Sequence, residues 1–198
     1  MEIIEVTQRS EEWFKARLGI PTASHFHEIL TSEGKRSRQR DKYLYKLAAE
    51  RVSGIPSESY SSEAMERGTN LEEEARLIYK LITGNTVDVP GFCLDEEGYG
   101  CSPDGLVDSD GLLEIKCPLP HNHVGYVISE SVPIQYYPQI QGQLLVTERK
   151  WCDFMSYSPN MKPLILRVDR DKNYINALEK ELKLFIAELE EVEKKLKI

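Results

Sequence analysis

The sequence has few cysteines, and their spacing argues against the common cysteine-based sites. None of the four forms a Cys-x-x-Cys pair, the spacing typical of zinc clusters and redox-active disulfides. With 198 residues, 40% of them hydrophobic, the chain is large enough to form a core without disulfides or a structural metal. We therefore expect four small, largely buried thiols, at Cys93, Cys101, Cys117 and Cys152.

Long apolar runs are also absent. No run approaches the ~20 residues that are needed to span a membrane. The first residues, MEIIEVTQRSEEW, lack the basic and then apolar pattern of a signal peptide. These features predict a cytoplasmic protein with no membrane partner.

Basic residues are in the minority, with 25 Lys and Arg against 33 Asp and Glu and a formal net charge of -8. That balance alone argues against a nucleic-acid partner. The charges are sorted along the chain, however, because residues 58–114 hold 14 acidic and 3 basic residues, whereas residues 35–51 hold 7 basic and 2 acidic ones. The basic segment either contacts phosphates, through Arg36, Arg38 and Arg40, or is the solvated face of an amphipathic helix.

Hydrophobic periodicity and capping residues divide the chain into helices and short strands. Helices are predicted over residues 10–18, 22–34, 37–52, 70–84 and 133–145 and from 171 onward, the first, second and fourth capped by Ser10, Thr22 and Asn70. Strands are expected over 86–94, 99–102, 112–117, 151–158 and 164–168. This order predicts an α/β (mixed α+β) fold in a single domain over residues 1–198, with a central mixed five-stranded sheet flanked by helices and a long C-terminal helix.

Charged residues lie on two neighbouring strands in the middle of the chain. In the run LEIKCP (113–118), Glu114 and Lys116 point to the same face of the strand, because alternate side chains share a face. Asp104 follows the preceding strand, before the hairpin that returns into this one, so the two carboxylates can converge. Carboxylates with open positions suit Mg²⁺, which stabilises the charge that develops in phosphodiester cleavage. The alternative interpretation is an exposed, salt-bridged Glu-x-Lys face.

A Pro-Asp pair followed by Glu-x-Lys on the next strand resembles the PD-(D/E)xK nuclease superfamily. Five strings, in the same order, resemble the phage lambda-type exonuclease, or YqaJ-like viral recombinase, family: RLGIPTAS (17–24), ERGTNLEEEAR (66–76), CSPDG (101–105), LEIKCP (113–118) and YYPQIQGQL (136–144). The resemblance covers most of the chain, and it implies a restriction-endonuclease-like core.

The resemblance also implies roles at matching positions. Four positions match the metal site, namely Asp104, Glu114, the backbone carbonyl of Ile115 and the additional acid Glu72. Lys116 matches the residue that positions or deprotonates the attacking water. The family's binding residues for a terminal 5'-phosphate match Arg17, Ser24, Ser102 and one of the pair Gln139 and Gln141, of which Gln141 aligns better.

By this resemblance we expect an Mg²⁺-dependent exonuclease, with Mn²⁺ as a possible substitute, that digests duplex DNA in the 5'-to-3' direction from 5'-phosphorylated ends. Its product would be a 3' single-stranded overhang for homologous recombination. The family further implies a homotrimeric ring around DNA, a single-strand annealing protein as partner, and a source in a bacterial host or prophage.

Two other functions stay open at this point. An iron–sulfur nuclease of the same superfamily needs four clustered cysteines, and a non-catalytic module would bind DNA ends without turnover. The histidine pairs His25/His27 and His121/His123 we interpret as surface residues rather than as a zinc site.

Overall fold

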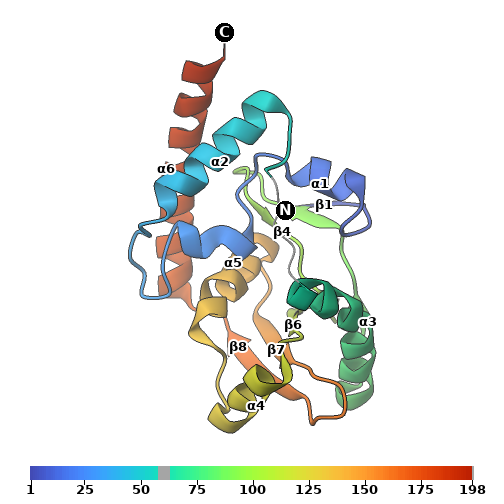
Figure 1. The fold of residues 1–198 in the computed structure, drawn as a ribbon. Helices are drawn as coiled ribbons and strands as arrows, with labels where there is room; N and C mark the ends of the chain where they lie inside the picture. The colour runs from blue at the N-terminus through green and yellow to red at the C-terminus, as the bar shows by residue number, and fades with distance from the viewer. Residues whose placement is uncertain (58–62, 198) are drawn as a thin grey trace.

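The computed structural model of the chain describes residues 1–57 and 63–197, and only the backbone of residues 63–69. A five-stranded sheet with the order β2-β5-β6-β7-β8 lies at its centre (Figure 1). Strands β6 and β7 run parallel, and the other neighbours run antiparallel. This confirms the predicted mixed sheet, whose strands are β2 (Val87–Asp88), β5 (Gly105–Val107), β6 (Gly111–Lys116), β7 (Trp151–Ser156) and β8 (Leu164–Asp169).

A second, three-stranded sheet with the order β1-β3-β4 was not predicted. It consists of β1 (Glu2–Ile4), β3 (Phe92–Leu94) and β4 (Gly100–Cys101). The single strand expected over 86–94 is therefore divided between the two sheets. Pro90 has no N–H to donate, and a Cβ added to Gly91 would lie 2.3 Å from the Ile4 carbonyl oxygen. The chain passes from one sheet to the other at this Pro-Gly pair.

Helices cover both faces of the central sheet. Helix α6 (Lys172–Leu196) runs along one side with α2 (Arg40–Ser53) across it, and α3 (Glu63–Thr83) lies on the other side (Figure 1). The parallel connection from β6 to β7 passes through α4 (Pro120–Ser129), the 3₁₀ turn η2 (Ile134–Tyr136) and α5 (Tyr137–Thr147).

Alternate residues of β6 enter two different parts of the core, as the strand pattern predicts. Leu112 packs in the larger cluster with side chains of α2, α5 and α6, whereas Leu113 and Ile115 pack in a smaller cluster with Ala75 and Tyr79 of α3. Side chains at alternate positions share a face. Glu114 and Lys116 therefore face α5 rather than α3.

The N-terminal elements match the prediction in part. Helix α1 (Glu11–Arg17) is capped as expected, with the Trp13 N–H donating to Ser10 Oγ at 3.2 Å. In place of a helix over 22–34 there is a short 3₁₀ helix, η1 (Ala23–Glu28). The Thr22 hydroxyl does not cap it, because it contacts Arg17 and Ser24 instead.

Two helices differ more strongly from the prediction. Helix α3 begins at Glu63, because the stretch before Asn70 contains several good helix formers. Asn70 therefore lies inside the helix and does not cap it. The side chains of residues 66–69, at the start of the 66–76 string, are outside the described part. Helix α4 was not predicted, because Pro118 and Pro120 indicate a loop, yet proline also fits the first position of a helix. Over the described residues, no helix is long and apolar enough to cross a membrane.

Candidate active site

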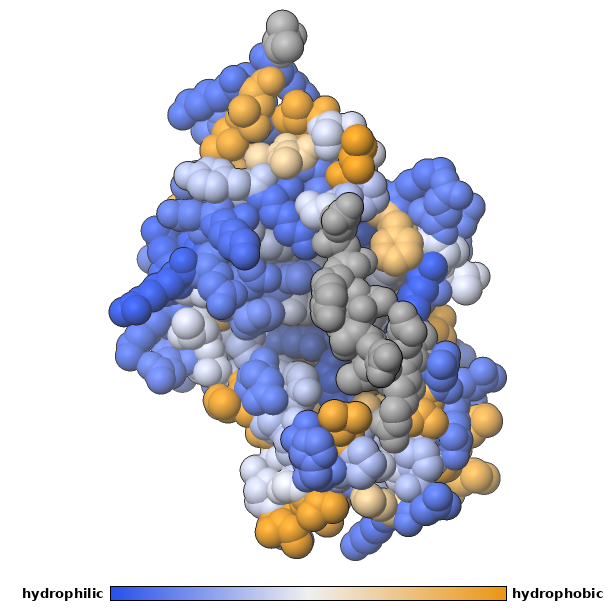
Figure 2. All heavy atoms as spheres, viewed as in Figure 1, coloured by the Kyte–Doolittle hydropathy of each residue, from blue (hydrophilic) through white to orange (hydrophobic). Residues whose placement is uncertain are grey.

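A cavity of about 330 Å³ opens between the central sheet, α3, α5 and the segment from Gln8 to Ser24. The face shown in Figure 2 is hollowed near its centre, and mostly hydrophilic residues surround the hollow. Nine of the residues singled out in the sequence line this cavity, namely Arg17, Ser24, Glu72, Ser102, Asp104, Glu114, Ile115, Lys116 and Gln139. Side chains that are up to 122 positions apart in the chain thus meet in one place.

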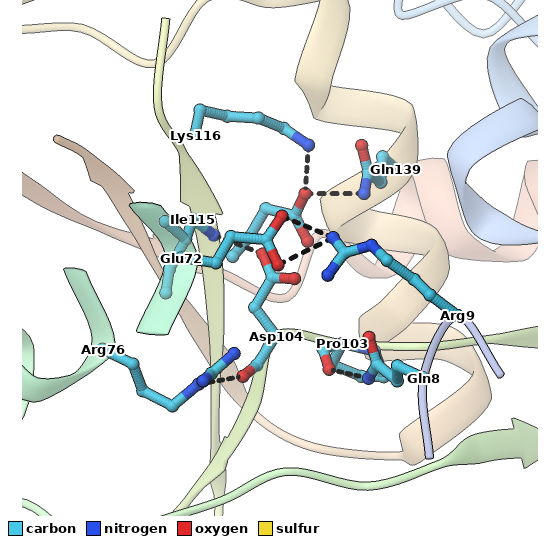
Figure 3. Close-up of polar contacts among 10 residues, drawn as sticks. Gln8, Arg9, Glu72, Arg76, Pro103, Asp104, Ile115, Lys116 and Gln139 are labelled. Atoms are coloured by element: carbon cyan, nitrogen blue, oxygen red, sulfur yellow. Dashed lines mark hydrogen bonds and ion pairs between the residues drawn. The ribbon is translucent and has the colours of Figure 1, made fainter. Parts of the chain in front are cut away.

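Glu114 is the most enclosed carboxylate of the cavity, with 2% of the residue exposed. Its Oε1 lies 2.5 Å from Lys116 Nζ and accepts a hydrogen bond from Gln139 Nε2 at 2.6 Å (Figure 3). Gln143 Nε2 donates to its Oε2, also at 2.6 Å. Both oxygens of this buried carboxylate are therefore partnered, as the cost of burying a charge requires.

Asp104 has a different environment. Its Oδ2 accepts a hydrogen bond from the Ile115 N–H at 2.6 Å, and no cation forms an ion pair with it among the described residues. Arg76 Nε donates to the Asp104 backbone carbonyl at 2.9 Å and so holds the main chain. Burial, and then the negative charges of Glu114 and Glu72, raise the pKa of Asp104 well above its usual value.

Lys116 lies among these carboxylates. Burial acts to lower the pKa of Lys116, but the charges of Glu114 and Asp104 outweigh burial and raise that pKa. The side chain also lies over the ring of Tyr136, with Nζ 5.1 Å from the ring centroid. Lys116 is therefore an ammonium group at neutral pH.

Glu72 on α3 reaches the cavity, and its partner was not predicted from the sequence. Arg9 Nη2 lies 2.6 Å from Glu72 Oε1 and 2.7 Å from Oε2 (Figure 3). Arg9 comes from the turn before α1, 63 positions away from Glu72 in the chain. No periodicity or motif in the sequence points to this contact.

Three of the predicted phosphate-binding residues, Arg17, Ser24 and Ser102, line the same cavity and are linked through Thr22 and Trp13. The Arg17 guanidinium lies 3.7 Å from the centre of the Trp13 ring, and its Nη2 donates to Thr22 Oγ1 at 3.3 Å. Thr22 Oγ1 in turn lies 3.3 Å from Ser24 Oγ. Trp13 Nε1 donates to Ser102 Oγ at 2.9 Å, so Trp13 connects Ser102 to this group.

Arg17 has no carboxylate partner in the part of the chain that the structure describes, since none of the ion pairs there includes it. Burial lowers the pKa of Arg17 to about 10, which leaves it protonated at neutral pH. A half-buried cation that contacts the Thr22 hydroxyl, in a cavity that Ser24 and Ser102 also line, is suited to an anion with several acceptor oxygens, such as a phosphate.

The two glutamines of the QIQ run lie on different sides of α5. Gln139 lines the cavity, whereas Gln141 is fully buried elsewhere, donating to the Asp169 carbonyl at 2.9 Å and accepting from the Asp171 N–H at 2.9 Å. The structure therefore brings Gln139 and not the preferred Gln141 into the cavity. Gln143 was missed, although its spacing of four residues from Gln139 places both on one helix face.

The basic segment makes contacts inside the protein that the sequence did not reveal. Arg40 is only 4% exposed, and its Nη1 lies 2.6 Å from Glu188 Oε2 on α6, with its guanidinium over the Phe185 ring. Arg36 pairs with Glu181 of α6 at 2.9 Å. Of the three arginines proposed to meet DNA, Arg40 joins α2 to α6, Arg36 ties the loop before α2 to α6, and Arg38 is exposed.

We expect Arg40→Glu to lower the free energy of unfolding by about 3–5 kcal/mol, because it places a buried, uncompensated negative charge beside Glu188. The matched exposed variant Arg38→Glu should change it by less than about 0.5 kcal/mol. Urea denaturation of both variants measures the difference. Equal losses in the two variants would contradict the buried contact of Arg40.

The cysteines do not gather as a cluster site would require. Cys93 and Cys101 face each other across β3 and β4, whereas Cys152 lies in β7 of the other sheet, and all three are buried as expected. Among the described residues, no three His, Cys, Asp or Glu side chains are close enough to hold a metal ion as they stand. Nothing in this placement favours the iron–sulfur alternative. The prediction that His123 lies at the surface is wrong. This residue is only 1% exposed, and its Nδ1 lies 2.8 Å from Ser156 Oγ.

Comparison with known proteins identifies one family and several similar solved structures. The family model of the YqaJ-like viral recombinase domain matches residues 12–150. The crystal structure of LHK-Exo in complex with dAMP has a TM-score of 0.85 and 38% identity to this chain, and covers 93% of this chain and 95% of that chain.

A further crystal structure, described as an alkaline exonuclease (LHK-Exo) from Laribacter hongkongensis, has a TM-score of 0.84 at 37% identity with the same coverage. A phage-related exonuclease from Haemophilus somnus 129PT, at 13% identity and a TM-score of 0.72 over 93% of this chain and 99% of that one, shares the fold.

One curated protein, the uncharacterized protein R354 of Acanthamoeba polyphaga mimivirus, is 26% identical over 174 residues. The matched region covers 78% of this chain and 30% of the length of that relative. The family match covers more than half of the chain, and the LHK-Exo structures match nearly all of it. The chain therefore belongs to the YqaJ-like viral recombinase family and has the fold of the alkaline exonucleases.

Proposed function

We propose that this protein is an Mg²⁺-dependent exonuclease that digests one strand of duplex DNA in the 5'-to-3' direction, starting at a 5'-phosphorylated end. The product would be a 3' single-stranded overhang, ready for homologous recombination. One observation carries the proposal. A single cavity contains both the acidic cluster with Lys116 and the cation Arg17, which forms no ion pair among the described residues and lies near hydroxyl groups.

The solved relatives support this proposal. LHK-Exo is described as an alkaline exonuclease, and one of its crystal structures contains dAMP, a nucleoside monophosphate. A mononucleotide is the product expected of an enzyme that removes terminal nucleotides. A phosphate group on such a molecule has the charge and the acceptor oxygens that Arg17, Ser24 and Ser102 could bind.

The residues of the cavity fit a divalent cation. Asp104 is a carboxylate without a cationic partner among the described residues, and the buried Gln143 Oε1 has no hydrogen-bond donor. Oxygen donors of this kind suit Mg²⁺, with Mn²⁺ as a substitute. The ion would be held by Asp104, Glu114, the Ile115 carbonyl and Glu72, and it would supply a Lewis acid and a more acidic water molecule.

The residues of the chain itself would act as follows. Gln139 and Gln143 hold the Glu114 carboxylate in one orientation from α5. Lys116, protonated beside Glu114, places a positive charge where negative charge develops on the cleaved phosphate, and so favours the transition state. Arg17 and its neighbouring hydroxyls bind the terminal 5'-phosphate and fix how far the strand enters the cavity.

The assembly is part of the same proposal. A homotrimeric ring around duplex DNA would keep the enzyme on its substrate, and a single-strand annealing protein would receive the overhang. Exposed apolar side chains on α3, at Leu77, Leu81 and Ile82, provide surface that such contacts could cover. We place the activity in the cytoplasm of a bacterial host, whether encoded by the host or by a prophage.

Digestion of linear and covalently closed circular duplex DNA, with Mg²⁺ or with EDTA, tests the proposal. The linear substrate carries a 5'-phosphate on one strand and a 5'-hydroxyl on the other. We expect only the 5'-phosphorylated strand to shorten, from its 5' end and only with Mg²⁺. Cutting of the circle would indicate an endonuclease, and DNA binding without product would indicate a non-catalytic end-binding module.

A further inference from the structure

Arg9 occupies the oxygens of Glu72 that a metal ion would need. A single nitrogen, Arg9 Nη2, lies 2.6 Å and 2.7 Å from the two carboxylate oxygens. The side chain of Glu72 is 17% exposed, whereas that of Arg9 is 44% exposed. Arg9 therefore has room to leave, while Glu72 is held among its neighbours.

The turn that carries Arg9 is fixed on both sides. Gln8 Nε2 donates to the Pro90 carbonyl at 2.9 Å and to the Pro103 carbonyl at 3.0 Å, which ties the turn to the residue before Asp104 (Figure 3). On the other side, Ser10 caps α1. Arg9 itself has a φ of 70°, a backbone conformation that residues other than glycine rarely adopt. Such conformations persist where the surrounding structure imposes them, often at functional sites.

The charges around the cavity explain why a cation is useful at this position. Three carboxylates, Glu72, Asp104 and Glu114, meet two cations that contact them, Arg9 and Lys116. With all three carboxylates ionised, this part of the site therefore has one negative charge in excess. A divalent cation would reverse the excess to one positive charge, which matches the single negative charge of a DNA phosphodiester.

We propose that Arg9 is an exchange residue: it neutralises Glu72 until a divalent cation binds, and then leaves Glu72 to contact a phosphate of the bound DNA. This inference rests on the proposed function, since it needs both the cation and the DNA substrate. Arg9 and the cation compete for the same oxygens, whereas Arg9 and DNA attract each other. Removing the charge of Arg9 should therefore strengthen metal binding and weaken DNA binding.

A calorimetric titration of the protein with Mn²⁺, in the absence of DNA, tests the competition between Arg9 and the metal ion. We expect Arg9→Met to bind Mn²⁺ roughly tenfold more tightly than the wild type, because the competing charge is gone. Arg36→Met is the matched control, since Arg36 also forms a half-exposed ion pair with a glutamate, Glu181, away from the cavity. Its Mn²⁺ affinity should equal that of the wild type.

A second titration measures binding of 5'-phosphorylated duplex DNA in the presence of Ca²⁺, under conditions in which no product forms. Arg9→Met should bind this DNA several-fold more weakly, and the slope of log affinity against log salt should be smaller by about one. Arg167→Met, which removes a half-exposed ion pair with Asp153 outside the cavity, should change neither value. If Arg9→Met does not fold, Arg9→Gly replaces it, because glycine adopts the same φ without strain.

The outcomes separate this inference from the proposed function. Unchanged or weaker Mn²⁺ binding by the Arg9 variant would overturn the exchange and leave the nuclease proposal intact. Unchanged DNA affinity would overturn the second half of the exchange. A wild type that binds no Mn²⁺ would overturn both the exchange and the metal site on which the proposed function depends.

Discussion

Asp104→Asn is expected to lower the rate of Mg²⁺-dependent DNA cleavage by roughly a thousandfold. The substitution keeps the shape of the side chain and an oxygen that can accept from the Ile115 N–H, but it removes a carboxylate charge that forms no ion pair among the described residues. Loss of metal-assisted stabilisation costs several kcal/mol of activation free energy, and each ~1.4 kcal/mol is a factor of ten in rate. Single-turnover cleavage of a 5'-phosphorylated duplex measures the loss.

The unfolding temperature of Asp104→Asn is the control, because it shows whether the substitution damages the fold. The raised pKa of Asp104 means that, without divalent metal, the folded protein keeps a proton that the unfolded chain has released above about pH 4. The free energy of unfolding therefore falls as the pH rises from there to the raised pKa. Asp104→Asn removes this loss, so in EDTA at pH 8 it should unfold at a higher temperature than the wild type.

A lower unfolding temperature would show that Asp104 stabilises the fold, and the loss of cleavage could then not be assigned to chemistry. Wild-type-like cleavage by a stable Asp104→Asn would remove Asp104 from the metal site. The two measurements together thus distinguish a lost catalytic group from a damaged structure.

Arg17→Met is expected to reduce the preference for 5'-phosphate over 5'-hydroxyl ends by roughly 10- to 100-fold. Hydrogen bonds to a charged group contribute about 1.5–3 kcal/mol, and Arg17 is a cation that lines the cavity together with Ser24 and Ser102. Methionine keeps an unbranched apolar stem that can still pack against Trp13. The measurement compares cleavage rates on two duplexes that differ only in the terminal phosphate.

The control for Arg17 is the length-matched variant Arg36→Met, which removes a positive charge outside the cavity. It should leave the ratio of the two rates unchanged, even if overall DNA binding weakens slightly. Equal losses of Arg17→Met on both ends would show that Arg17 contacts DNA without reading the phosphate.

The sequence predicted those parts of the molecule that depend on local periodicity. The two-residue alternation of β6 placed Glu114 and Lys116 on one face, and the apolar stripe of α6 predicted a long amphipathic helix. The strings that resemble the family located most residues of the cavity, because they carry side-chain identity as well as spacing.

Contacts between distant segments could not be predicted from local periodicity. Arg9 meets Glu72, and Arg40 meets Glu188, across 63 and 148 positions, and no local pattern encodes either pair. The basic stretch was therefore interpreted by its charge alone, although much of that charge is paired with α6. Gln143 is the exception, since its helical spacing from Gln139 was available in the sequence.

The length of the first product tests the central claim most directly, because we propose that cleavage and recognition of the 5' end take place in one cavity. The substrate is a duplex whose 5'-phosphorylated strand carries a label on its first nucleotide, cut once with Mg²⁺ in a single turnover. We predict that the labelled product is a 5'-mononucleotide. A labelled oligonucleotide as the first product would contradict it, since the cut would then lie beyond the reach of a strand end held at Arg17.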